Sequence, residues 1–72
     1  MNKKWNLKLQ VPNHPIVNNI VAVVKDTTDY NTYRIVNLSF QTLWKEKFCT
    51  EKDAINKIIN FKNKFLIDIQ EI

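Results

Sequence analysis

The stretch TLWKEKFCTEKDAINKIINFKNKF, residues 42–65, contains the last strand and the only long helix that the sequence predicts. Trp44 and Phe48 are an even number of residues apart, so both lie on one face of a strand. Thr50, with Asp53 three residues later, is an acidic variant of the capping box that starts a helix. Apolar residues then recur at helical spacing, namely Ala54, Ile55, Ile58, Ile59, Phe61, Phe65 and Leu66.

The end of this helix is ambiguous in the sequence. Phe65, Ile67 and Ile69 alternate with polar residues, which is also the pattern of an extended segment. We predict a capped helix over residues 50–66 and a short tail over residues 67–72.

The preceding part of the chain is rich in strand patterns. Residues 1–12 are predicted to form an N-terminal strand that ends in a proline loop, because apolar residues from Trp5 to Val11 alternate with polar ones. Residues 16–49 are predicted to form antiparallel strands, separated by a polar turn at residues 26–31 and a second turn near residues 39–42. The turn near residue 40 has no clear position, since Phe40 is an unusual turn residue.

These elements predict one α+β domain over residues 1–72, with an antiparallel sheet of three or four strands packed on one C-terminal helix. In the third strand, Val36, Leu38 and Phe40 are expected to face the helix, as is Phe48. From the helix, the residues expected to bury against the sheet are Ala54, Ile55, Ile58, Phe61 and Phe65.

Length and composition limit the class of protein. A 72-residue chain buries only about 60% of the surface that its unfolded form exposes, so formation of a homodimer would stabilise it. No apolar run is long enough to span a bilayer, and polar residues interrupt any signal peptide, so we expect a cytoplasmic protein. Cys49 is the only cysteine, which excludes an internal disulfide.

No enzyme is expected from the sequence. The chain has no glycine, so it contains no glycine-rich phosphate loop and no nucleophile elbow. His14 and Cys49 have no partners at catalytic or metal-ligand spacing. We therefore predict no catalytic residues, no metal and no cofactor.

A local pattern across the predicted strand and helix resembles a known family. Trp44, Phe48, Thr50 and Ala54 form W-x3-F-x-T-x3-A, which is similar to the junction in AP2-type DNA-binding domains and in the arm-binding domains of phage-type integrases. The resemblance implies a three-stranded sheet backed by a C-terminal helix, with the exposed sheet face entering the major groove of DNA. The single arginine, the missing glycines and the additional N-terminal strand depart from the family pattern.

The charge balance gives the main functional hypothesis. Eleven Lys and Arg stand against seven Asp and Glu, which favours a polyanionic partner but equally fits a solvated surface. We predict a nucleic-acid-binding domain, from a phage or mobile element, that uses a basic open sheet face. The candidate contact residues on that face are Lys25, Tyr33, Asn37, Lys45 and Lys47.

A second class fits the same sequence. A small inhibitor or adaptor of phage type would work by covering another macromolecule, and aromatic residues would anchor such an interface. The candidate anchors are Trp5, Tyr30, Tyr33 and Trp44. The two hypotheses differ in the expected effect of salt, which weakens phosphate binding steeply and an aromatic protein interface little.

Overall fold

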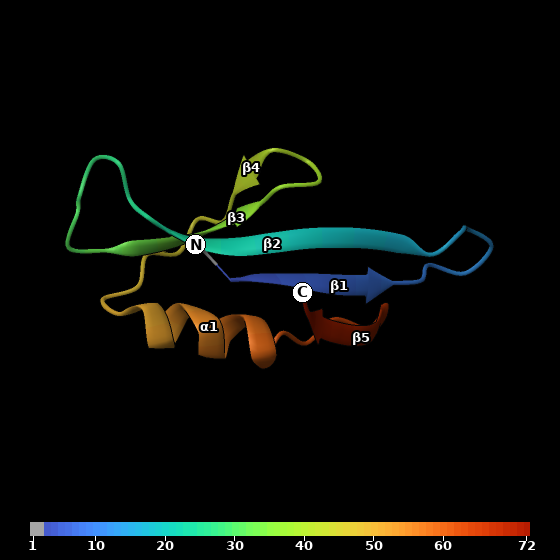
Figure 1. The fold of residues 1–72 in the computed structure, drawn as a ribbon. Helices are drawn as coiled ribbons and strands as arrows, with labels where there is room; N and C mark the ends of the chain where they lie inside the picture. Colours follow the sequence, from blue (N-terminus) through green and yellow to red (C-terminus); the bar gives the residue numbers. More distant parts are fainter. Residues whose placement is uncertain (1–2) are drawn as a thin grey trace.

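Five β-strands and one α-helix make up the fold of residues 3–72, the part of the chain that this computed structural model describes (Figure 1). The elements follow in the order β1 (Lys4–Leu9), β2 (Val17–Lys25), β3 (Tyr33–Asn37), β4 (Thr42–Leu43), α1 (Glu51–Ile59) and β5 (Leu66–Glu71). The predicted α+β class is confirmed. The sheet has five strands where the sequence predicts three or four, and the helix precedes the last strand. Met1 and Asn2, at the start of the predicted segment 1–12, lie outside the described residues.

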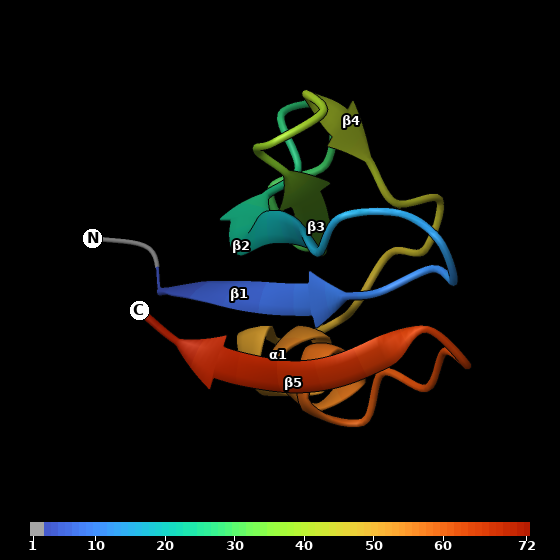
Figure 2. The ribbon, with the colours of Figure 1, turned by 90° about the vertical axis from the view of Figure 1, so that its right-hand side faces the viewer.

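The strands form one antiparallel sheet in the order β4-β3-β2-β1-β5. Figure 2 shows β1 running between β2 and β5, with the short β4 at the far edge. Strands β1 to β4 are joined to their sequence neighbours, as in a meander. The chain then passes through α1 and returns to pair β5 with the free edge of β1.

One face of the sheet packs against α1 and forms the core. The register pairs Trp5 with Val21 and Val23 with Ile35, so these side chains share one face. From α1, Ala54 and Ile58 are fully buried against them. Half-buried side chains complete the cluster: Tyr33, Trp44, Phe48, Ile55, Phe61, Leu66 and Ile69.

Helix α1 starts where the sequence predicts. The hydroxyl of Thr50, which is in an extended conformation, accepts a hydrogen bond of 3.1 Å from the Asp53 N–H. This bond satisfies one of the backbone donors that the first turn leaves free. Of the residues predicted to bury, Ala54 and Ile58 are fully buried, whereas Ile55, Phe61 and Phe65 are half-buried.

The helix ends earlier than the predicted residue 66. It stops at Ile59, where Asn60 caps it, and the Asn60 side chain donates to the Asn56 carbonyl at 2.8 Å. Asn63 then forms a turn, because its side-chain oxygen accepts from the Phe65 N–H at 2.8 Å. Residues 66–71, predicted partly as helix and partly as tail, form β5.

The orientation of β3 also differs from the prediction. Ile35 is fully buried beneath α1, whereas Val36 lies on the opposite face, paired with Ala22. Strand β3 ends at Asn37, whose side chain accepts from the Phe40 N–H at 3.1 Å and so forms a turn. Leu38 and Phe40 are consequently exposed instead of facing the helix. The expectation that Val36, Leu38 and Phe40 pack inward is therefore wrong.

Among residues 3–72, no helix is long and apolar enough to cross a bilayer.

Candidate functional site

An open groove of about 590 Å³ lies between the C-terminal end of α1 and the segment that follows β4. Its position results from the early end of the helix, since the residues after Ile59 turn back beside Trp44 instead of continuing away from it. We call it the basic groove, and its lining residues are Leu43, Trp44, Lys45, Glu46, Lys57, Asn60, Phe61 and Lys62.

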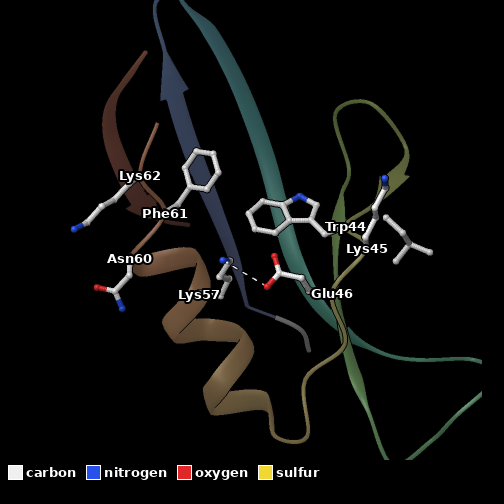
Figure 3. Close-up of a pocket in the computed structure, with 8 residues that line it drawn as sticks. Trp44, Lys45, Glu46, Lys57, Asn60, Phe61 and Lys62 are labelled. Atoms are coloured by element: carbon white, nitrogen blue, oxygen red, sulfur yellow. Dashed lines mark ion pairs between the residues drawn. The ribbon is translucent and has the colours of Figure 1, made fainter. Parts of the chain in front are cut away.

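Two aromatic rings form the apolar part of the basic groove. The ring centroids of Trp44 and Phe61 are 5.6 Å apart and their planes are inclined by 43° (Figure 3). Both side chains are half-buried, with their inner parts packed on the core and the remainder accessible from the groove. The backbone of Trp44 is fixed on two sides, because its N–H donates to Ile35 and its carbonyl accepts from Arg34.

Charged side chains surround the two rings. Figure 3 shows Lys45 and Lys62 on opposite sides of the ring pair. Lys57 lies close to the rings and forms a 3.5 Å ion pair with Glu46, and both of these side chains are about half exposed. Three lysines and one glutamate give the lining a formal charge of +2, so the basic groove attracts anions.

Three of the predicted contact residues do not lie on an open face. The register places Lys25, Tyr33 and Asn37 on the face that carries α1. Tyr33 packs against the core, and the ammonium group of Lys25 lies 5.9 Å from the centroid of its ring. Asn37 uses its side-chain oxygen in the turn after β3. The predicted cluster on an open sheet face is therefore not formed.

The other two predicted contact residues, Lys45 and Lys47, lie in different environments. Lys45 lines the basic groove. Lys47 points to the buried carboxylate of Asp26, at 3.7 Å, and Arg34 contacts the same oxygen at 3.3 Å. Hydrogen bonds from the hydroxyl and the N–H of Thr28 hold the pKa of Asp26 well below its usual range, and the Arg34 bond adds to this effect. Lys47 therefore belongs to a structural network.

The sheet face opposite α1, which we call the open face, is largely apolar over β2 to β4, whereas β1 contributes Lys4, Asn6 and Lys8 to it. Its apolar side chains are Ile20, Ala22, Val24, Val36, Leu38 and Leu43. Leu38 is 42% exposed and Leu43 is 55% exposed. A second hollow of about 450 Å³ lies at the edge of this face and is lined by Lys4, Ile20, Leu38, Ser39 and Ile72.

Sequence patterns alone do not identify Lys57, Phe61 and Lys62 as site residues. The helical spacing assigns Phe61 to the core, and it places Lys57 on the solvated side of a longer helix. One signal in the sequence points to the groove: an aromatic residue is followed directly by a lysine at Trp44-Lys45 and again at Phe61-Lys62.

Comparisons with known proteins add no relative. Neither the family models, nor the curated proteins, nor the solved structures include a match to this chain. Within residues 3–72, no group of three or more His, Cys, Asp or Glu side chains could hold a metal ion. The AP2-type resemblance stays a prediction.

Proposed function

We propose that this protein is a non-enzymatic nucleic-acid-binding domain and that the basic groove is its binding site. The observation that carries the proposal is the pair of accessible aromatic rings, Trp44 and Phe61, flanked by Lys45 and Lys62 on opposite sides. Lysines bind backbone phosphates, and aromatic faces bind bases. An anionic polymer that crosses the rings would meet a lysine on each side of them.

The proposal keeps the function predicted from the sequence but moves its site. Lys45 is retained from the predicted set, whereas Lys47 is engaged with Asp26, and Tyr33 with the core. The open face is a less suitable polyanion surface over β2 to β4, because it presents exposed apolar side chains there, Leu38 and Leu43.

Binding to a mixed pool of labelled oligonucleotides, measured by fluorescence anisotropy at low and moderate salt, tests this proposal. A Lys45→Gln, Lys62→Gln variant should bind more weakly, and its salt dependence should fall by roughly one power of salt concentration for each phosphate that it no longer neutralises. The matched control is Lys4→Gln, Lys52→Gln, which removes the same charge at exposed positions outside the basic groove. Equal binding by the two variants would reject the basic groove as the site.

The open face supports a second candidate function, the protein-binding inhibitor or adaptor. Its specific observation is the group of exposed apolar side chains on this face, with Leu38 42% and Leu43 55% exposed, and with Ile72, 68% exposed, beside Leu38 in the second hollow. Clustered exposed apolar side chains commonly mark protein interaction sites. Of the predicted aromatic anchors, Trp5 is buried in the core and Tyr30 is exposed. Binding of this kind would change little with salt and would be weakened by Leu38→Ser.

A further inference from the structure

We propose that the basic groove selects single-stranded nucleic acid, because its two rings require an unpaired base. This inference rests on the proposed function and specifies its ligand. The relevant chemistry, a free base face next to a phosphate backbone, is common to single-stranded DNA and RNA. Bases inside a duplex are stacked on both faces, so an aromatic side chain has no access to them.

The geometry of the rings determines how a base can bind. A centroid distance of 5.6 Å is within the contact range of aromatic pairs, so Trp44 and Phe61 touch and leave no space for a base between them. The ring planes are inclined by 43° and both residues line the basic groove, and we call this inclined ring pair the aromatic corner. A base that enters the basic groove would stack on one ring while its edge contacts the other ring.

The charges around the corner suit a strand that passes over it. Lys45 and Lys62 both line the basic groove and lie on opposite sides of the ring pair (Figure 3). A chain of nucleotides with one base in the corner would place phosphates toward both lysines. Lys57 lies near the rings and can exchange its half-exposed partner Glu46 for a phosphate.

The sheet face predicted to enter the major groove of a duplex is poorly suited to that contact over β2 to β4. Entry of a sheet face into the major groove requires a polar, basic face. The residues predicted for that contact, Tyr33 and Asn37, share the face that α1 covers, and the open face presents Leu38 and Leu43. The aromatic corner is thus the feature that distinguishes between the two forms of nucleic acid.

An abasic oligonucleotide tests the inference without altering the protein. Four labelled probes of about twelve nucleotides, a length suited to small single-strand sites, would be compared at one low salt concentration: single-stranded DNA, single-stranded RNA, duplex DNA and an abasic strand. The intact single strands should bind about 5- to 100-fold more tightly than the abasic strand, as expected for one stacked base. They should also bind more tightly than the duplex.

Variants of the rings add a second measurement. Trp44→Leu and Phe61→Leu should remove most of the difference between intact and abasic strands, with the fold verified by circular dichroism. If either variant does not fold, tryptophan fluorescence of the wild-type protein is measured instead while single strands are added. Quenching would report on Trp44, because the other tryptophan, Trp5, is buried.

The outcomes separate this inference from the proposed function. Equal affinity for intact and abasic strands, or tighter binding of the duplex, would overturn the selection of single strands and leave nucleic-acid binding in place. Tighter binding of only DNA or only RNA would support the inference and identify the source of the ligand. Absence of binding to all four probes would overturn both and direct attention to a protein partner on the open face.

Discussion

Arg34 donates a hydrogen bond of 2.5 Å from its guanidinium group to the main-chain carbonyl of Trp44. The same guanidinium group contacts the buried carboxylate of Asp26 at 3.3 Å. The wall of the basic groove is therefore attached to the turn between β2 and β3 through one arginine. Because Lys47 contacts the same carboxylate, the segment between β4 and α1 is attached at two points.

The Asp26 network predicts a pH-dependent contribution to stability. The pKa of Asp26 is lowered in the folded protein, chiefly by the Thr28 hydrogen bonds. Its contribution is complete above the ordinary carboxyl pKa of about 3.9 and is lost as the pH falls toward the lowered folded value. Asp26→Asn should lower the free energy of unfolding at pH 7, and urea unfolding should show a smaller difference from wild type at pH 3.

The control for this prediction is Asp68→Asn, at an exposed position on β5. It should change the free energy of unfolding by less than about 0.5 kcal/mol at pH 7. A difference between Asp26→Asn and wild type that stays constant from pH 7 to pH 3 would contradict the assigned role of the carboxylate.

The core prediction concerns two neighbouring isoleucines of α1. Ile58 is fully buried and Ile59 is 54% exposed. Ile58→Ala should reduce the free energy of unfolding by about 2–5 kcal/mol, because it leaves a cavity among packed side chains. Ile59→Ala should reduce it by less than about 1 kcal/mol. Chemical denaturation of both variants measures these changes. Similar losses of unfolding free energy in the two variants would mean that the buried face of α1 is wrongly assigned.

Two isoleucines of β5 should differ in their contribution to the free energy of unfolding. Ile69 packs on the core and pairs with Leu7, whereas Ile67 is 52% exposed. Ile69→Ala should therefore lower the free energy of unfolding by about 1–3 kcal/mol. Ile67→Ala should have an effect below about 1 kcal/mol. A flexible tail over residues 67–72 would instead make both substitutions neutral.

Neutralisation of Glu46 should raise the affinity of the protein for nucleic acid. Glu46→Gln removes the one negative charge of the basic groove and releases Lys57, and removal of this surface ion pair costs at most about 1 kcal/mol of stability. Nucleic-acid affinity at low salt should rise roughly two- to fivefold, with a steeper salt dependence. Anisotropy titrations at several salt concentrations measure both effects. Unchanged affinity would show that Lys57 is not a phosphate ligand.

The start of the helix and its buried stripe could be predicted because both are local. Thr50 and Asp53 specify the cap within one turn, and Ala54 and Ile58 lie four residues apart on one face. These interactions exist in the helix itself and need no knowledge of the rest of the fold.

The end of the helix and the fifth strand could not be predicted with the same certainty. The apolar pattern through Leu66 fits a helix, but Asn60 and Asn63 provide side-chain hydrogen bonds that favour a stop and a turn. Residues 66–71 become a strand by pairing with β1, about sixty residues earlier in the chain. A local sequence pattern does not contain the energy of pairing between strands that are far apart in the chain.

The orientation of β3 shows a second limit of sequence patterns. Alternation separates Tyr33, Ile35 and Asn37 from Val36 and Leu38, but it does not identify the buried set. Pairing of Ile35 with Val23 settles this point, because it places Ile35 with the core residues of β2. The predicted contact residues followed the wrong choice, and among them only Lys45 lines the basic groove.

The most direct test of the account is a nuclear magnetic resonance titration of the labelled protein with single-stranded DNA. The two tryptophans supply an internal comparison, since Trp44 lines the basic groove and Trp5 is buried in the core. We expect the indole N–H signal of Trp44 and the amide signals of Lys45, Phe61 and Lys62 to shift, while the Trp5 indole signal stays in place. Shifts confined to the open face, at Val36 and Leu38, or no shift at low salt, would contradict the assignment of the basic groove as the nucleic-acid site.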